Sequence, residues 1–211
     1  MAQALNKTKR RITSVKSTKK ITEAMELVAT VKLKKFKNVM ERNQFYVKEM
    51  ENVIFHLFGA LDAESENPYI LEGKGDKDLV VIINSNLGLC ASYNSNVFNF
   101  VKENISKESS IILPIGLKGE LNYSKEGYEV ISEYVKLNEK LDYDATAKLG
   151  RHLHSEFLKG EYRSIKVVYT KYVNSLRFVP TLITLFPIVN KEEKQDIRYA
   201  PIYDPNVKTL I

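Results

Sequence analysis

The chain has 211 residues, of which 44% are hydrophobic and 27% charged, and its net charge is +6. This composition is that of a protein with enough apolar residues for one hydrophobic core. The longest apolar stretches, Leu79–Ile83 and Val179–Val189, are too short or too interrupted by Pro and Thr to cross a bilayer, so no transmembrane helix is predicted. The single cysteine, Cys90, excludes an intrachain disulfide and favours a reducing compartment, the cytoplasm.

Residues 1–61 predict one long amphipathic helix. Apolar residues recur every three or four positions from Ile12 to Leu61, and no Pro or Gly interrupts the pattern before Gly59. At about 1.5 Å per residue, this helix would extend on the order of 80 Å. An apolar stripe of that length is too long for one small domain to cover, so we expect it to pair with another helix or to lie inside another protein.

The first forty residues hold most of the positive charge. Eleven Lys and Arg residues are opposed there only by Glu23 and Glu26, which leaves a local excess of +9. Such a face is either a solvated surface or a binding surface for an acidic protein, nucleic acid or an anionic membrane. Nucleic acid is the weaker choice, because Ile21, Met25 and Val28 interrupt the basic residues with an apolar patch.

After a polar connector at residues 62–78, the pattern changes to alternating strands and helices. Leu79–Asn84 is a continuous β-branched run, typical of a strand buried on both faces of a parallel sheet. We therefore predict a Rossmann-like, three-layer α/β domain at residues 79–196, with an antiparallel edge. The predicted strands are 79–84, 110–116, 128–132, 164–172 and 178–189, and the predicted helices are 95–104, 117–125 and 144–158.

Residues that could support catalysis are scarce. His152 and His154 lie two apart on a predicted helix, so they face different sides, and surface positions are expected for both. Cys90 follows the first strand, where α/β enzymes place active sites, but no nearby histidine would activate it and a packing role is favoured. The same loop has one glycine, Gly88, too few for a phosphate-binding loop. We expect no cofactor, no metal and no catalysis by this chain alone.

Three segments resemble the gamma subunit of F-type ATP synthases. The first is Arg11–Leu33, R-I-T-S-V-K-S-T-K-K-I-T-E-A-M-E-L-V-A-T-V-K-L, which is similar to the N-terminal signature of that family. The second is Gly88–Asn96, similar to the family's G-L-C-G-G-Y-N run, and the third is Tyr203–Val207, similar to its Y-E-P-x-P turn. They occur in family order and span almost the whole chain.

This resemblance implies a rotor that couples rotation to nucleotide synthesis or hydrolysis in other subunits. The N-terminal helix would be half of an antiparallel coiled coil inside a ring of alpha and beta nucleotide-binding subunits. The α/β domain would lie beside the epsilon subunit and the membrane c-ring, so the chain would be peripheral on the inner face of the cell membrane. The implied residues are Lys19, Lys20, Met25 and Lys32 for contact with the catalytic subunits, Ile21, Val28 and Val31 for the seam, and Gly88, Cys90, Tyr93 and Asn94 in the domain loop.

The chain also departs from the family pattern. Ala91 and Ser92 replace the usual paired glycines, and Glu23 stands where a basic residue is common. Residues 197–211 read as a connector and the start of a truncated C-terminal helix, so we expect the long C-terminal partner helix to be missing. The alternative function is a basic coiled-coil adaptor for nucleic acid or an anionic membrane. The rotor interpretation instead predicts no nucleic acid and no small-molecule substrate.

Overall fold

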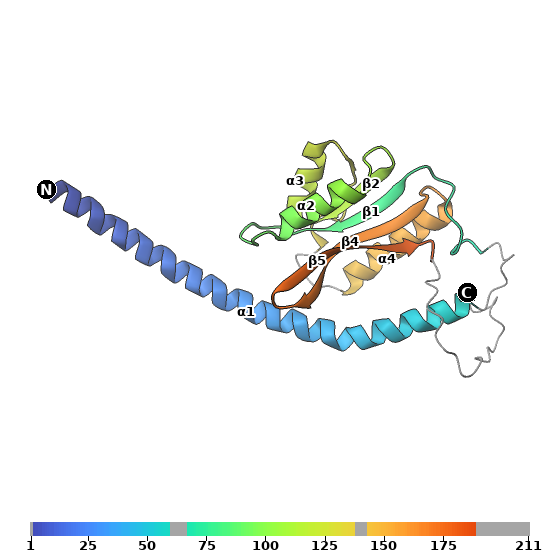
Figure 1. Ribbon diagram of the computed structural model, residues 1–211, viewed down its shortest axis with the longest axis horizontal. Helices are drawn as coiled ribbons and strands as arrows, with labels where there is room; N and C mark the ends of the chain where they lie inside the picture. Colours follow the sequence, from blue (N-terminus) through green and yellow to red (C-terminus); the bar gives the residue numbers. More distant parts are fainter. Residues whose placement is uncertain (1, 60–66, 138–142, 189–211) are drawn as a thin grey trace. The chain divides into compact units, whose positions relative to one another are not determined.

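The computed structural model describes residues 2–59, 67–137 and 143–188 (Figure 1). These residues belong to two compact units, the long first helix and an α/β domain, and each unit is described by itself. The predicted connector and helix start at 197–211 lie outside the described residues, as do 62–66 of the first connector and 189–196 of the predicted domain.

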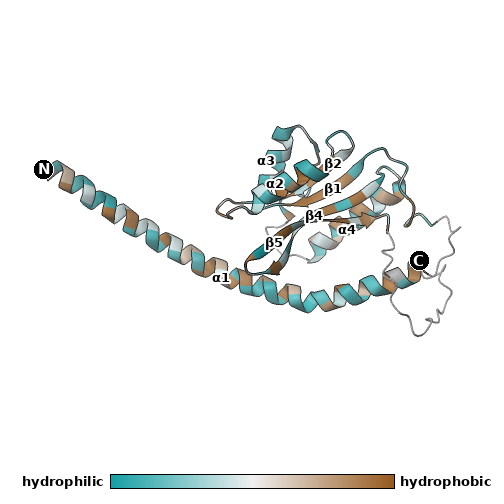
Figure 2. Cartoon of the chain, viewed as in Figure 1, coloured by the Kyte–Doolittle hydropathy of each residue, from teal (hydrophilic) through white to brown (hydrophobic). Residues whose placement is uncertain are grey.

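Helix α1 runs from Ala2 to Gly59, a length of 58 residues. Its continuity confirms the predicted helix and follows from the absence of Pro and internal Gly. Residues 3–51 of α1 are all solvent-exposed. Figure 2 shows apolar and polar residues interleaved along the whole helix.

The domain is built on one five-stranded sheet in the order β3-β2-β1-β4-β5. Strands β1 to β4 are parallel, and β5 pairs with β4 in the antiparallel direction, as predicted for the edge. A short turn after Asn174 joins β4 to β5. The Asn174 side chain stabilises this turn by accepting hydrogen bonds from the backbone N–H groups of Leu176 and Arg177. The strands are β1 Asp78–Ile83, β2 Ser110–Ile115, β3 Glu129–Val130, β4 Ser164–Asn174 and β5 Arg177–Phe186.

Helices cover both faces of this sheet and complete three layers (Figure 1). Helices α2 (Tyr93–Asn104) and α3 (Leu117–Glu126) pack on one face, with Val80 and Ile82 of β1 in their core. Helix α4 (Tyr143–Lys159) packs on the other face, where Leu79 and Val81 are buried. Successive side chains of β1 thus enter opposite cores, which explains its uninterrupted apolar sequence.

Strand β3 is shorter than the five residues predicted from the sequence. Only Glu129 and Val130 pair with β2. Tyr128, which was assigned to the strand, is buried instead between the helices and the sheet, where its hydroxyl donates to the Ile105 carbonyl at 3.2 Å. The large ring of Tyr128 also packs edge-on against that of Tyr123, at 5.9 Å between centroids. Side-chain burial thus takes precedence over strand pairing here.

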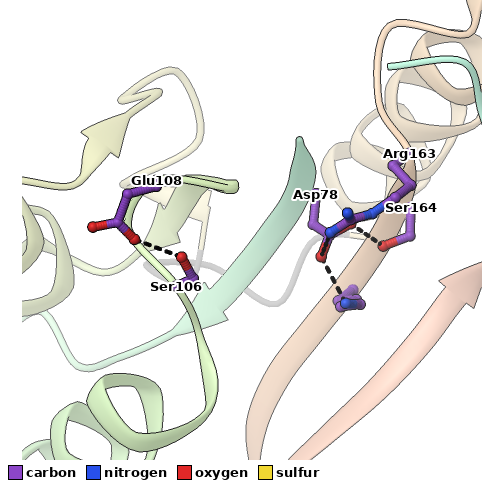
Figure 3. Close-up of polar contacts among 6 residues, drawn as sticks. Asp78, Ser106, Glu108, Arg163 and Ser164 are labelled. Carbon is purple, nitrogen blue, oxygen red and sulfur yellow. Dashed lines mark hydrogen bonds and ion pairs between the residues drawn. The ribbon is translucent and has the colours of Figure 1, made fainter. Parts of the chain in front are cut away.

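Strand β1 begins at Asp78, a residue that the sequence assigned to the connector. Asp78 is 5% exposed, and its carboxylate is held by three side chains of strand β4 and the turn before it (Figure 3). Arg163 Nε and Ser164 Oγ donate to Oδ1 at 2.9 and 2.8 Å, and Lys166 Nζ donates to Oδ2 at 2.7 Å. Burial alone would raise the pKa of Asp78, but these donors outweigh it and lower the pKa to about 2.

A second polar contact in Figure 3 lies on the surface of the same domain. Ser106 donates a hydrogen bond to the Glu108 carboxylate at 2.6 Å, and this bond lowers the pKa of Glu108. Both residues are exposed, in the loop between α2 and β2. Water can replace that bond, so the Asp78 cluster is the one of the two that stabilises the domain.

Candidate partner-binding surfaces

The apolar seam of α1 follows a heptad pattern. In the continuous helix, Ile21 and Val28 are one heptad apart and Val31 follows three residues later, which are the spacings of the core positions of a coiled coil. Ala24 supplies the remaining core position between Ile21 and Val28. The helix therefore brings the three predicted seam residues into one line that a second helix could cover.

Met25 and Lys32 lie together on one flank of this seam. They are also one heptad apart, and each follows a seam position by one residue, so both occupy the position that borders a partner helix. Lys20 lies on the other flank, because it precedes Ile21 by one residue. Lys19 faces away from the seam and forms an ion pair with Glu23, at 3.6 Å between Nζ and Oε1. The four predicted contact residues thus surround the helix instead of sharing one face.

The seam and its flank are open to solvent in the described part of the chain. The exposed fractions are 59% for Ile21, 48% for Met25, 54% for Val28 and 62% for Val31. Large apolar side chains that remain this exposed over many turns mark a surface for association. Among the residues that the structure describes, none of the helices has a stretch of sufficient length and hydropathy to be a membrane span.

In the α/β domain, Asn94 organises the loop that follows β1. Its Oδ1 accepts a hydrogen bond from the backbone N–H of Ser85 at 3.1 Å, and its Nδ2 donates to Ser85 Oγ at 2.7 Å. The same Nδ2 also donates to Cys90 Sγ at 3.1 Å. A single amide in the first turn of α2 therefore braces the loop at both Ser85 and Cys90.

Two other residues of this loop, Tyr93 and Cys90, also make contacts within the domain. Tyr93 donates its hydroxyl to the Ile83 carbonyl at 3.2 Å, and burial raises the pKa of this phenol. Cys90 is half-buried and contacts the Asn94 amide, as expected of a packing residue. Gly88 has open space where a side chain would be, so steric crowding does not require glycine there. The N-cap residue of α2 is Ser92, whose hydroxyl accepts a hydrogen bond from Asn96 Nδ2 at 3.3 Å but does not cap a backbone N–H of the helix.

Two residues of the loop have left-handed backbone conformations. Leu89 has φ of 60° and Ala91 has φ of 47°. A side chain destabilises this region by about 1 kcal/mol relative to glycine. Ala91 is the first of the two residues that replace the family's glycine pair, so the structure supplies a physical reason for glycine at this position.

The described residues contain no group of three or more His, Cys, Asp and Glu side chains that could hold a metal ion. His152 and His154 are each half-buried, and so differ from the surface positions that the sequence predicted for them. His154 lies 3.0 Å from the Tyr69 hydroxyl through Nε2, and their rings stack at 5.7 Å. His152 packs against Tyr134, with 5.6 Å between ring centroids.

The Tyr69–His154 and Asp78 clusters were missed by sequence reasoning. Their partners are 85 or more residues apart in the chain. Periodicity and motif spacing report only local neighbours, so neither cluster had a local signal. A carboxylate directly before a buried strand was the one visible hint at Asp78.

Comparison with known proteins places the chain in a family. A family model described as ATP synthase matches residues 4–211. The ATP synthase gamma chain of Clostridium kluyveri is 31% identical over 208 residues, which cover 96% of this chain and 73% of the relative. The gamma chain of Mycoplasma mobile is 36% identical over 197 residues, which cover 90% of this chain and 67% of the relative.

A solved structure shares the fold. The central stalk and c-ring structure of the Tetrahymena thermophila mitochondrial ATP synthase contains a chain that matches with a TM-score of 0.57 at 17% identity. The match covers 90% of this chain and 83% of that one. At this identity the likeness shows a shared fold, and the sequence matches show the family. The chain belongs to the ATP synthase gamma chain family.

Proposed function

We propose that this gamma chain is a central-stalk rotor subunit that couples rotation to ATP synthesis or hydrolysis in the nucleotide-binding subunits. Helix α1 supports this proposal most directly. It is 58 residues long, and its seam residues remain exposed over consecutive heptads. A shaft needs this geometry, because one side must accept a partner helix while the remaining surface meets the subunits around it.

The proposed partners are the alpha and beta nucleotide-binding subunits around α1, with the epsilon subunit and the c-ring beside the α/β domain. The related Tetrahymena structure is of a central stalk and c-ring, which supports the assignment to the stalk. Attachment through such a complex would make the chain peripheral on the inner face of the membrane. Catalysis would belong to the nucleotide-binding subunits, and this chain would transmit their motion without a catalytic site of its own.

We assign the contact with the catalytic subunits to the surface around Met25. Lys32 lies on the same flank, Lys20 lies across the seam, and the surrounding forty residues carry the +9 excess. A surface with this charge fits an acidic partner segment. Because the apolar part is small and exposed lysines form weak, salt-screened pairs, the contact would be strong enough to guide the shaft and weak enough to be exchanged as it turns.

The experiment compares Met25→Lys with Val53→Lys in the assembled complex. Both residues are exposed and apolar on α1 and occupy the same heptad position, but Val53 lies four heptads further along, about 42 Å away. We expect Met25→Lys to weaken the coupling between ATP hydrolysis and ion pumping, with Val53→Lys close to wild type. The helical content of both variants by circular dichroism serves as the folding control. Equal coupling in the two variants would remove the Met25 surface from the proposal.

A further inference from the structure

The chain enters the α/β domain through residues 67–77, which we call the entry strap. The strap has no helix or strand, yet it is tied to the domain along its whole length. It begins with a turn in which the Asn67 side chain accepts a hydrogen bond from the backbone N–H of Tyr69 at 2.9 Å. It ends at Asp78, the first residue of the central strand β1.

The beginning of the strap is attached to α4 and to the end of β5. The Tyr69 hydroxyl is within hydrogen-bond distance of His154 on α4, and its ring also packs against Phe186 of β5, at 6.3 Å between centroids. The Tyr69 carbonyl accepts a hydrogen bond from the N–H of Ile188 at 2.7 Å. One residue of the strap is thus joined to two elements that lie far from it in sequence.

Two glycines hold the middle of the strap against the backbone before β4. A Cβ atom at Gly73 would overlap the carbonyl of Tyr162, and one at Gly75 would overlap the carbonyl of Glu161. Neither neighbour can move like a flexible side chain, because both are backbone atoms. The Gly73 N–H donates to the Arg163 carbonyl at 2.9 Å, so the close approach also forms a hydrogen bond.

The end of the strap is held by backbone and side-chain bonds to the same turn. Arg163 donates its N–H to the Lys77 carbonyl at 2.8 Å, and its guanidinium is paired with Asp78. Ser164 donates a further hydrogen bond to the Asp78 carboxylate (Figure 3), and so does Lys166. Charge-assisted bonds of this kind are the strongest available to side chains, and here they lie at the point where the strap becomes β1.

From this arrangement we propose that the entry strap is a mechanical anchor. Force applied to residue 67 from the α1 side must first break the contacts of the strap with α4, with β5 and with the turn before β4. Only then does the force act on the central strand β1. The strap distributes the load over several elements, and it shields the ladders of β1 with β2 and β4. Its use in torque transmission depends on the proposed rotor function, whereas its resistance to force is a property of this chain alone.

The test is single-molecule pulling on the full chain with Cys90→Ser, along two paths. One path joins Lys48→Cys in α1 to Lys102→Cys in α2 and passes through the strap. The other joins Lys102→Cys to Lys148→Cys in α4 and does not. The perturbing variant is Gly75→Ala, and the matched control is Gly150→Ala, an exposed helical glycine whose Cβ would meet open space.

We expect Gly75→Ala to shorten the lifetime of the domain under constant force on the order of tenfold along the strap path, the effect of losing one or two hydrogen bonds. Along the other path, the lifetime of Gly75→Ala should change far less. Gly150→Ala should shorten the lifetime along neither path, because alanine favours the helix there. If Gly75→Ala does not fold, Tyr69→Phe, which removes the hydroxyl that contacts His154 and keeps the ring, must shorten the strap-path lifetime selectively. Equal shortening along both paths, or none along the strap path, would overturn the proposal.

This outcome is separable from the test at Met25. The pulling experiment uses no other subunit, so a selective loss along the strap path would support the anchor even if the complex did not assemble. The expected coupling defect in Met25→Lys, together with equal shortening of the Gly75→Ala lifetime along both pulling paths, would support the rotor function and reject the anchor.

Discussion

Asp78→Asn tests the buried ionic cluster at the start of β1. The substitution keeps the shape of the side chain but removes the charge that faces Arg163 and Lys166, and it turns an NH₂ group toward one of these donors. Since the pKa of Asp78 falls from 3.8 to about 2 in the folded chain, its charged form gains about 2 kcal/mol over the protonated form. Loss of the charge should therefore cost about 2 to 3 kcal/mol of unfolding free energy at pH 7.

The pH dependence follows from the direction of the shift. A pKa that is lower in the folded state means that the unfolded chain binds the proton first, so stability falls with decreasing pH. The contribution of Asp78 is fully present above about pH 4 and is lost as the pH falls toward about 2. The difference in stability between the wild type and Asp78→Asn should shrink over this range.

Urea unfolding followed by tyrosine fluorescence measures both effects, because the chain has 12 Tyr and no Trp. The control is Glu129→Gln, which removes an ion pair with Lys77 whose two side chains are 41% and 56% exposed. Its cost should stay below about 1 kcal/mol. If Asp78→Asn costs no more than the control at pH 7, or if its cost is the same at pH 7 and pH 3, the cluster does not stabilise the fold as argued.

The remaining predictions concern the loop after β1. Ala91→Gly should raise the unfolding free energy by up to about 1 kcal/mol, because glycine accepts the φ of 47° without a side-chain clash, and a loss of stability in urea unfolding would contradict this. Asn94→Ala should lower the unfolding free energy by about 1 to 2 kcal/mol, since the backbone N–H of the half-buried Ser85 loses its partner, whereas Asn96→Ala on the exposed face of α2 should be nearly neutral. The same Asn94→Ala change should speed the reaction of Cys90 with a thiol reagent, because the loop is no longer held by the amide, and an unchanged rate would refute the bracing role.

The sequence predicted the elements of the fold because their signals are local. The run Leu79–Ile83 reports burial on both faces of a strand, and the absence of Pro and Gly before Gly59 reports the length of α1. Strand β3 was predicted too long because the pattern does not distinguish a strand residue from Tyr128, whose ring belongs to a core formed by distant helices.

The candidate surfaces were predictable to different degrees. The seam residues of α1 were expected from the family resemblance, and their heptad spacing is compatible with that expectation. The place of Lys19 on the outward face emerges only when the helix is followed residue by residue. The bracing by Asn94 depends on a turn with two residues in the left-handed conformation. The sequence gives no signal for such a turn when neither residue is glycine. The Asp78 cluster depends on pairing between β1 and β4, which are separated by 85 residues or more.

The central claim, that this chain is a rotor subunit, is tested most directly by watching it turn. The full chain would be assembled with the alpha and beta nucleotide-binding subunits of the same cells, fixed to a surface through those subunits, and labelled with a bead at an engineered cysteine in the α/β domain. We predict continuous rotation of the bead in one direction that requires ATP and stops with a non-hydrolysable analogue. ATP hydrolysis by a complex that contains the chain, without any rotation of the bead, would contradict the account.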